Sequence, residues 1–181
     1  ACAAVASWNR QRSEPLKMAV NLSARQFGEG NELIETVQGA LTATGCRPEW
    51  LELEITESLL LDGSEGVRQS LEALAAMGIT IAIDDFGTGY SALGYLTRLP
   101  VQTLKIDRSF VSELPNNTRS AELVKAIVSV GRSLNMVLVA EGVETTEQAA
   151  YLNSVGCHLA QGYLFSRPVE MAAFDKLLVS P

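Results

Sequence analysis

Six short segments of mostly apolar residues recur along the chain at regular intervals, and each has the length and composition of a β-strand. They begin at Met18, Leu51, Ile79, Thr103, Met136 and His158. Between them, apolar residues recur three and four positions apart, which is typical of an amphipathic helix. Three such helix faces are predicted: Leu33, Val37, Ala40 and Leu41; Val67, Leu71, Leu74 and Ala75; and Leu123, Ile127, Val130 and Leu134.

The regular alternation of strands and helices predicts an α/β domain with a parallel sheet. The strand segments are nearly continuous in apolar residues, which favours a sheet that is covered on both faces. No linker or low-complexity segment divides residues 1–181, so we expect one domain. Two folds satisfy this pattern, an open doubly wound sheet and a TIM barrel.

Polar residues at the C-terminal ends of the predicted strands distinguish these two folds. They are Asn21, Glu54, Asp84 with Asp85, Lys105 with Asp107, Glu141 and Gln161. In a barrel all strand ends converge on one mouth, whereas an open sheet uses mainly the point where the strand order reverses. The pattern therefore predicts a TIM (β/α)8 barrel with about six of its eight units in this chain. Because such a barrel typically has ~250 residues, we expect one or two strands to precede Ala1.

Composition and charge exclude several classes of function. The formal net charge of −7 argues against a nucleic-acid polymer as partner, although bound divalent cations would still admit an anionic substrate. No apolar run approaches the ~20 residues that span a bilayer. The three cysteines are scattered, which favours reduced, buried thiols in a cytoplasmic protein. The single histidine, His158, excludes a multi-histidine metal site and leaves no obvious Ser-His triad.

The oxygen-bearing side chains at the strand ends suggest metal chemistry. Asn21, Glu54, Asp84 and Asp85 offer hard ligands that suit Mg²⁺ or Mn²⁺ better than zinc. Two adjacent aspartates can each contact a different ion, and paired ions suit an in-line phosphoryl displacement. Lys105 and Glu141 could then orient or deprotonate a water held by the metal. Glycines follow Asp85, so the next loop is expected to be mobile or tightly folded.

Each of these residues also has an ordinary structural interpretation. Two aspartates after a strand often form a turn and a helix cap, and Glu57 could be an acidic residue at a helix start. Lys105 and Asp107 could form a surface pair. Agreement among six strand ends favours the functional interpretation. Glu52 shares its strand face with Glu54 but receives no role.

An ordered set of motifs along the chain resembles a known family. They are "NLS" at Asn21, "ELEITES" at Glu52, "DDFGTGYSAL" at Asp84, "LKIDRSFV" at Leu104, "AEGVET" at Ala140 and "QGYLFSRP" at Gln161. Together they resemble the EAL domain of cyclic-di-GMP phosphodiesterases over nearly the whole chain. The resemblance implies a modified TIM barrel that uses two Mg²⁺ or Mn²⁺ ions to activate water. It would hydrolyse bis-(3′-5′)-cyclic dimeric GMP to linear pGpG in bacterial second-messenger signalling.

The resemblance also implies a role for individual residues. Asn21, Glu54 and Asp84 resemble ligands of a first metal, and Asp84, Asp85 and Glu141 resemble ligands of a second. Lys105 resembles a lysine that orients water, and Glu57 a glutamate that anchors the "DFGTGYS" loop. Lys105, Glu141 and Glu57 are accordingly the expected catalytic residues. Gln161 and Asp107 are expected on the substrate side.

One departure from the family pattern concerns the Glu-Ala-Leu motif itself. The letters occur at Glu72–Leu74, but inside a predicted helix and out of the family's motif order, which indicates coincidence. We expect the true motif to precede Ala1, so the chain would be an EAL-type domain without its first strand or strands. Alone, it would show weak or no turnover. If the missing motif were degenerate, the protein would instead be a catalytically inactive cyclic-di-GMP receptor that acts through protein–protein contacts.

The parent protein is expected to be larger than this chain. A sensory or GGDEF domain would precede the domain, and a homodimer is plausible for the family. We expect the domain in the cytoplasm, and this location is compatible with a membrane anchor elsewhere in the parent.

Overall fold

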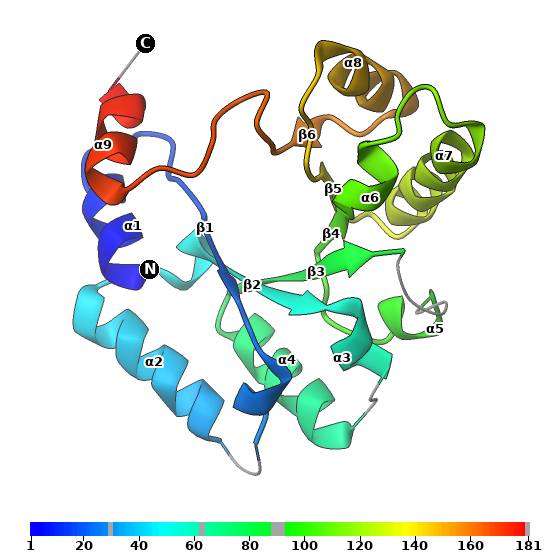
Figure 1. Cartoon of the computed structure of the whole chain (residues 1–181). Coiled ribbons are helices and arrows are strands. Elements are labelled where there is room, and N and C mark those ends of the chain that lie inside the picture. The colour runs from blue at the N-terminus through cyan, green and yellow to red at the C-terminus, as the bar shows by residue number, and fades with distance from the viewer. Residues whose placement is uncertain (29–30, 62–63, 88–92, 180–181) are drawn as a thin grey trace.

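A single parallel sheet forms the framework of the molecule. The computed structural model describes residues 1–28, 31–61, 64–87 and 93–179. The six strands are β1 (Met18–Asn21), β2 (Leu51–Thr56), β3 (Thr80–Phe86), β4 (Thr103–Ile106), β5 (Val137–Ala140) and β6 (Leu159–Ala160). They pair in parallel in the order β1-β2-β3-β4-β5-β6, and the sheet curves into a half-barrel (Figure 1). The predicted parallel α/β barrel architecture with about six units is confirmed.

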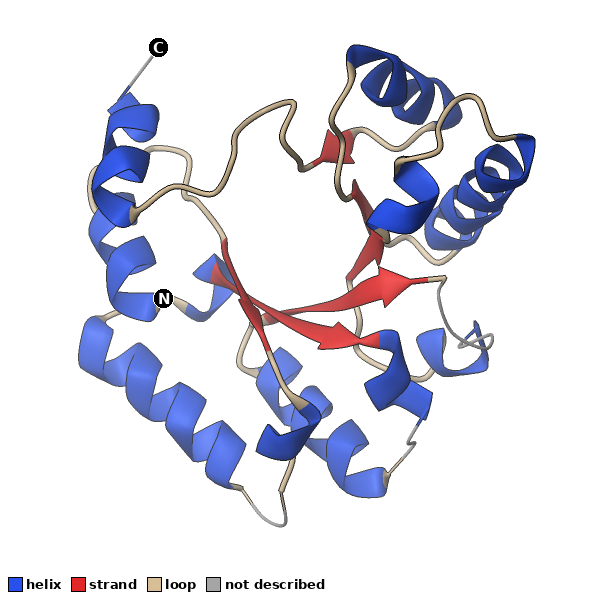
Figure 2. Cartoon of the chain, viewed as in Figure 1, coloured by secondary structure: helices blue, strands red, loops and turns tan. Residues whose placement is uncertain are grey.

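Helices connect the strands and lie outside the curved sheet (Figure 2). They are α1 (Cys2–Asn9), α2 (Glu32–Thr44), α3 (Glu57–Leu61), α4 (Glu65–Ala76), α5 (Leu93–Leu96), α6 (Arg108–Val111), α7 (Thr118–Ser133), α8 (Thr146–Val155) and α9 (Met171–Val179). Short 3₁₀ turns precede α2 and β2, at Ala24–Gln26 and Pro48–Trp50. Helices between successive strands carry the chain back to the start of the next strand, which is what parallel pairing requires.

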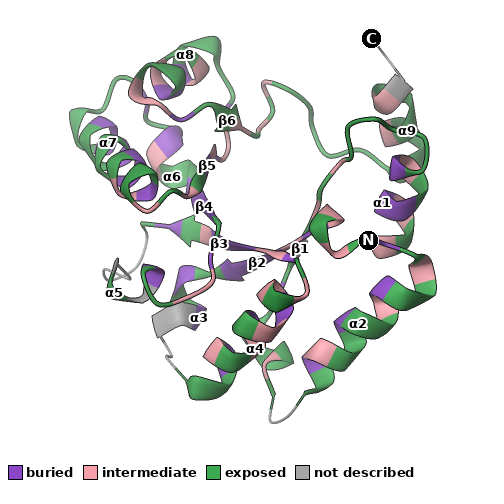
Figure 3. Cartoon of the chain, turned by 180° about the vertical axis from the view of Figure 1, so that it is seen from behind, coloured by how far each residue is buried: buried purple, intermediate pink, exposed green. Residues whose placement is uncertain are grey.

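The helix-facing side of the sheet forms the main core. Its central strands contribute the fully buried side chains of Ile55, Ile81, Ile83, Leu104 and Ile106. Figure 3 shows the buried colour on these strands and on the helix faces that cover them. The helices cover them with their own apolar stripes, for example Leu71 and Leu74 of α4, which are completely buried. Burial of these branched side chains supplies most of the stabilisation of the fold, because each contributes about 1.5–3 kcal/mol of transfer free energy.

The inner face of the sheet is different in composition. Alternate residues point there, and in the central strands they are Glu52, Glu54, Ala82, Asp84, Thr103 and Lys105. The parallel register places Glu54 opposite both Asn21 and Ala82 on the two neighbouring strands. The outer face of the sheet is therefore apolar and covered by helices, whereas its inner face carries polar and charged side chains.

The two ends of the sheet do not pair with each other, since β1 and β6 are its edge strands in the described residues. After β6 the chain crosses the open side, and α9 lies beside α1 (Figure 1). Trp8 Nε1 donates a hydrogen bond of 2.7 Å to Asp175 Oδ1, and the Trp8 and Phe174 ring centroids are 4.9 Å apart. The first and last helices are thus held together across the opening.

Two details of the predicted core are wrong. Leu123 is 40% exposed, because the buried stripe of α7 runs through Ala121, Val124, Val128 and Gly131 instead. Small residues on that helix face approach the sheet closely, and the larger Leu123 points to solvent. Cys46 and Cys157 are buried as expected, but Cys2 is only half-buried.

Two further observations bear on the sequence analysis. Across the described residues, no helix is long and apolar enough to cross a membrane. The loop after Gly87 was expected to be mobile or tightly folded, but residues 88–92 lie outside the described residues.

Candidate metal centre

The ammonium group of Lys105 lies at the centre of a cluster of carboxylates at the mouth of the half-barrel. Lys105 comes from β4, and its side chain is 6% exposed. Its Nζ atom lies 2.7 Å from Glu54 Oε1, 3.0 Å from Asp84 Oδ1 and 2.6 Å from Glu141 Oε1. These three carboxylates come from β2, from β3 and from the residue after β5. The convergence of strand ends that the sequence predicted therefore occurs.

The cluster carries more negative than positive charge. Burial alone would lower the pKa of Lys105, but its hydrogen bonds with Glu141 and Glu54 outweigh burial and raise that pKa above its usual value. Lys105 is therefore a stable cation. Burial raises the pKa of Glu141, and the nearby ammonium opposes this shift. One ammonium cannot neutralise the carboxylates of Glu54, Asp84 and Glu141, so the site has an electrostatic preference for additional cations.

A β-bulge brings the two adjacent aspartates to the same site. In a regular strand Asp84 and Asp85 would point to opposite faces of the sheet. Instead, the register between β3 and β4 shifts between Ile83 and Phe86, and Asp85 has a left-handed φ of 54°. Carboxylate oxygens of Asp84, Asp85 and Glu141 consequently all lie within 4.8 Å of one another. Phe86 beyond the bulge returns to the buried outer face.

The environment of Asp84 also bears on whether this cluster fits a cation. Its Oδ1 atom is shielded from solvent and accepts no hydrogen bond from the described residues, although Lys105 Nζ lies at ion-pair distance. A buried carboxylate oxygen without a hydrogen bond is costly, because it has lost its water and gained no full replacement. Oxygen donors of this kind, gathered at one point, fit a hard divalent cation such as Mg²⁺ or Mn²⁺.

Asn21 and Glu54 occupy the other side of the cluster. Asn21 ends β1 with its side chain exposed, and it is the register partner of Glu54 on β2. Glu54 is buried and is fixed by Lys105. The pairing of β1 with β2 thus places the backbone of Asn21 beside that of Glu54, which belongs to the cluster. Its assignment as a metal ligand stays a prediction.

Glu57 and Gln161 support the cluster from neighbouring elements. Glu57 begins α3, is 3% exposed, and accepts a hydrogen bond of 3.0 Å from the backbone N–H of Gly87. It therefore holds the point where the chain leaves β3. Gln161 follows β6, and its Nε2 atom donates a hydrogen bond of 2.6 Å to Glu141 Oε1. This bond orients Glu141 and places Gln161 at the rim of the mouth.

Asp107 has a clear structural role. It is the N-cap of α6, where its side chain accepts hydrogen bonds from the backbone N–H and the hydroxyl group of Ser109. It also contacts Asp85, and burial together with this contact raises the pKa of Asp85. Asp107 therefore positions Asp85 as well as α6. Its expected contact with substrate stays a prediction.

Glu52, which received no role from the sequence, lies deeper on the same inner face. Its Oε2 atom accepts a hydrogen bond of 3.0 Å from Thr103 Oγ1, and Lys17 Nζ lies 4.0 Å away. Thr103 and Lys105 are two residues apart on β4, as Glu52 and Glu54 are on β2. The alternation of side chains along a strand could have predicted this contact between Glu52 and Thr103, because Thr103 lies two residues from Lys105 and points to the same face.

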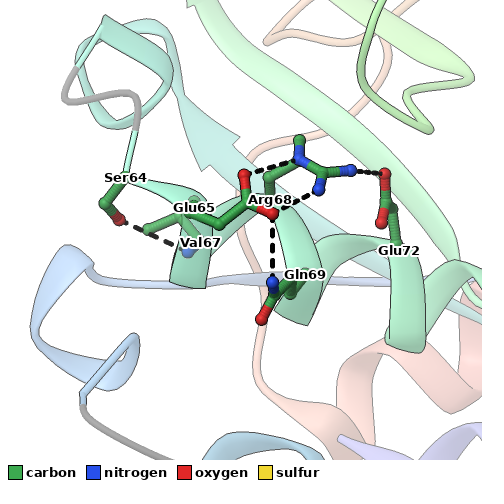
Figure 4. Close-up of polar contacts among 6 residues, drawn as sticks. All are labelled: Ser64, Glu65, Val67, Arg68, Gln69 and Glu72. Carbon is green, nitrogen blue, oxygen red and sulfur yellow. Dashed lines mark hydrogen bonds and ion pairs between the residues drawn. The ribbon is translucent and has the colours of Figure 1, made fainter.

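The letters Glu-Ala-Leu at Glu72–Leu74 lie within α4, and their Glu72 is on its exposed side. Figure 4 shows Glu72 paired with Arg68, which also pairs with Glu65. Leu74 is fully buried in the core beneath that helix. Such an (i, i+4) pair is common on exposed helix surfaces. Glu72 is therefore a surface residue on a helix outside the sheet, as the sequence analysis expected.

A cavity of about 890 Å³ adjoins the cluster and was not predicted. Glu141 and Gln161 form its side towards the cluster, and Arg108, Tyr163 and Arg167 also line it. Arg167 and Tyr163 lie inside the "QGYLFSRP" motif, of which only Gln161 was assigned. Strand periodicity could not identify them, because they lie in an irregular segment.

Comparison with known proteins gives close relatives among bacterial signalling proteins. The chain is 43% identical over 178 residues to the cyclic di-GMP phosphodiesterase NbdA of Pseudomonas aeruginosa, covering 98% of this chain and 23% of NbdA. It is 46% identical over 180 residues to the bifunctional diguanylate cyclase/cyclic di-GMP phosphodiesterase MucR of the same organism, covering 99% of this chain and 26% of MucR. The chain thus spans about a quarter of the length of these two relatives.

Solved structures share the fold. The PaMucR phosphodiesterase in its c-di-GMP complex is 44% identical with a TM-score of 0.90, over 96% of this chain and 70% of that one. The manganese/c-di-GMP complex of Klebsiella pneumoniae BlrP1 at pH 9.0 is 34% identical with a TM-score of 0.82, over 92% and 42%. Residues 1–168 match the family described as EAL domain. This chain belongs to the EAL domain family.

Proposed function

We propose that this chain carries the catalytic centre of a cyclic-di-GMP phosphodiesterase. The reaction would be hydrolysis of bis-(3′-5′)-cyclic dimeric GMP to linear pGpG. The observation that carries the proposal is the cluster of Glu54, Asp84 and Glu141 around Lys105, with an excess of negative charge at the mouth of the half-barrel. The named activities of NbdA and MucR support the same reaction.

The donor set suits two Mg²⁺ or Mn²⁺ ions. Asn21, Glu54 and Asp84 would hold the first, and Asp84, Asp85 and Glu141 the second. The close approach of the last three carboxylates and the buried Asp84 oxygen support this division. When bound, such ions lower the pKa of water and stabilise negative charge on a phosphoryl group.

The side chains themselves position the reactants. Lys105 would donate a hydrogen bond that orients the attacking water, while Glu141, fixed by Gln161, would accept the proton of that water. The water oxygen bonds to phosphorus, the bond from phosphorus to the 3′-oxygen breaks, and that oxygen leaves with a proton from solvent. The phosphate stays on the 5′-oxygen, which gives linear pGpG. Glu57 would fix the backbone at Gly87, directly after β3, beside this site.

The context of the domain is also part of the proposal. The open side between β1 and β6 supports completion of the barrel by a preceding segment that carries the Glu-Ala-Leu motif. The chain covers about a quarter of MucR and NbdA, which supports a longer parent, and the diguanylate cyclase activity named for MucR supports such a domain in it. We propose that a sensory or GGDEF domain precedes this one. We place the domain in the cytoplasm, where a dinucleotide messenger is produced and degraded. A homodimer is part of the same expectation.

Turnover tests the proposal. This chain and a version extended by its preceding residues would be incubated with cyclic-di-GMP and Mg²⁺, and pGpG would be followed by chromatography. We expect pGpG from the extended protein, little or none from the chain alone, and none from an extended Asp84→Asn variant. Binding of the dinucleotide without pGpG formation by the extended protein would contradict the enzyme and favour a receptor.

A further inference from the structure

Lys105 lies opposite the bulge of β3, so the pairing of β3 with β4 does not fix its position. The register of these strands is regular as far as Leu104, then shifts, and resumes only at Ile106. Lys105 lies between them and has no register partner among the described residues of β3. On its other side it pairs with Val139 of β5. Because a bulge disrupts the backbone ladder locally, the position of Lys105 depends strongly on side-chain contacts.

One side-chain contact restrains β4 directly below Lys105. Thr103, two residues earlier on the same inner face, is 2% exposed, and its Oγ1 atom donates a hydrogen bond of 3.0 Å to Glu52 Oε2. Glu52 belongs to β2, which is not adjacent to β4, so the bond crosses the inner face of β3. The residue of β3 beside Thr103 is Ala82, whose small side chain leaves room for this crossing. The bond therefore joins two strands that backbone pairing does not join.

This contact repeats, one layer deeper, a contact of the carboxylate cluster. Glu54 Oε1 lies 2.7 Å from Lys105 Nζ and also reaches from β2 to β4 across β3. Glu52 and Glu54 are two residues apart on β2, and Thr103 and Lys105 are two residues apart on β4. The two contacts are therefore parallel cross-links. The lower one holds β2 and β4 at the offset along the strand direction that the upper one requires.

Lys17 extends the lower layer to the other side of β2. It lies directly before β1, and its Nζ atom donates a hydrogen bond of 2.9 Å to Thr80 Oγ1 on β3. The same Nζ atom lies 4.0 Å from Glu52 Oε2. Because the Lys17 side chain is 47% exposed, this ion pair contributes little stability, whereas the bond from buried Thr103 is shielded from water. The Glu52–Thr103 contact is therefore the effective cross-link of the layer.

We propose that Thr103 and Glu52 are positioning residues for Lys105. The bond between them fixes the offset of β4 against β2 and keeps the Lys105 ammonium group where it would orient the attacking water. This inference rests on the proposed function, because it assigns that task to Lys105. The proposed metal ligands lie on other strands than β4. Disruption of the pair should therefore lower kcat and leave KM and the requirement for Mn²⁺ nearly unchanged.

Turnover of the N-terminally extended protein, measured over ranges of cyclic-di-GMP and Mn²⁺ concentration, tests this inference. Thr103→Val removes the hydroxyl group at nearly constant volume, and Thr103→Ser keeps it. Glu52→Ala and the double variant with Thr103→Val complete a double-mutant cycle. Thr42→Val is the matched control, because the Thr42 hydroxyl also donates a hydrogen bond, of 2.8 Å to the backbone oxygen of Gln38, but on the exposed side of α2.

The expected result is a loss confined to kcat. Thr103→Val should lower kcat about 10-fold to 100-fold, with less than about 2-fold change in KM and in the Mn²⁺ concentration for half-maximal activity. Glu52→Ala should lower kcat to a similar extent. The double variant should lose no more than the larger single loss, because the two residues act through one contact. Thr103→Ser should keep most of the activity, and Thr42→Val all of it.

The ammonium signal of Lys105 reports its position independently of turnover. In a ¹⁵N–¹H spectrum of this chain, the signal would be assigned by its disappearance in Lys105→Met. Hydrogen bonds to carboxylates in a buried site slow the exchange of the ammonium protons with water, so the signal should be visible in the unaltered chain. It should be shifted or broadened in Thr103→Val and unchanged in Thr103→Ser and Thr42→Val.

Other outcomes would overturn the inference in distinguishable ways. Unchanged kcat and an unchanged ammonium signal in Thr103→Val would remove any positioning role. A rise in KM and in the Mn²⁺ requirement that matched the loss of kcat would show general loosening of the site instead. Additive losses in the cycle would show that Thr103 and Glu52 act separately. Absence of pGpG from the unaltered extended protein would contradict the proposed function, and a Lys105 signal that still responded to Thr103→Val would then support the positioning alone.

Discussion

The two faces of one sheet differ completely in chemistry in this protein. On β4, Leu104 points outward into the core and is fully buried, while its neighbour Lys105 points inward and is held by three carboxylates. The outer face gains free energy from apolar burial. The inner face buries charged side chains, and their removal from water costs free energy. The interior of an ordinary barrel avoids this cost, because layers of branched apolar side chains fill it. The difference indicates that the outer face of the sheet contributes most of the folding stability, whereas the inner face carries the side chains that would bind a ligand.

Substitution of Lys105 tests the inner face and should have the largest effect. Lys105→Met keeps the length of the side chain but leaves the carboxylates without their ammonium. We expect turnover of the extended protein to fall by about 10²–10⁴-fold. Without divalent cations, the free energy of unfolding of the chain should fall by about 3–5 kcal/mol, because buried charge is left unpaired. Thermal denaturation with and without Mn²⁺ measures the second effect, and added Mn²⁺ should restore part of the loss.

Substitution of Leu104 is the matched test of the outer face. Leu104→Ala should lower the free energy of unfolding by about 2–5 kcal/mol through lost burial and the cavity left behind. Denaturant unfolding measures this loss. Unlike Lys105→Met, it should be equal with and without Mn²⁺. A loss that Mn²⁺ reverses in Leu104→Ala would contradict the separation of the two faces.

Asp85 lies in the bulge of β3, where the alternation of side chains between the two faces of the sheet is interrupted. Substitutions that change its backbone preference should have the third largest effect on stability. Its left-handed φ favours glycine, so Asp85→Gly should be about 1–2 kcal/mol more stable than Asp85→Ala in denaturant unfolding. Both variants lack the carboxylate, and both should bind Mn²⁺ more weakly than the unaltered chain. Equal stability of the two variants would show that the bulge relaxes without Asp85.

Glu72 should give the smallest effect. Glu72→Ala removes an exposed pair with Arg68, and a change of at most ~0.5 kcal/mol in the free energy of unfolding is expected. Turnover of the extended protein should be unchanged. Reduced turnover in this variant would mean that the letters Glu-Ala-Leu in α4 are functional after all.

The parallel sheet and most of the carboxylate cluster were predictable from patterns in the sequence. Parallel strands were predictable from alternation, and convergence of Glu54, Asp84, Lys105 and Glu141 was predictable from polar residues at strand ends. The bulge was not, because strict alternation places Asp84 and Asp85 on opposite faces. Only the tolerance of aspartate for a positive φ hinted at it.

Residues outside regular elements were the least predictable. The stacking of Arg167 on Tyr163 depends on how an irregular segment crosses the open side of the sheet, and no periodicity encodes that path. The exposure of Leu123 had a similar cause, since the spacing of apolar residues in α7 admitted two faces. Packing selected the face with Ala121 and Gly131, whose small size allows close approach.

Direct titration of Mn²⁺ most sharply tests whether the inner face is a cation site. Free Mn²⁺ would be measured by its electron paramagnetic resonance signal in the presence of the unaltered chain and of Asp84→Asn, which removes one charge at nearly constant volume. We expect saturable binding to the unaltered chain and at least ~10-fold weaker binding to the variant, since each lost carboxylate contact costs more than about 1.4 kcal/mol. Equal binding by the two proteins, or no binding by either, would contradict a metal centre at Asp84.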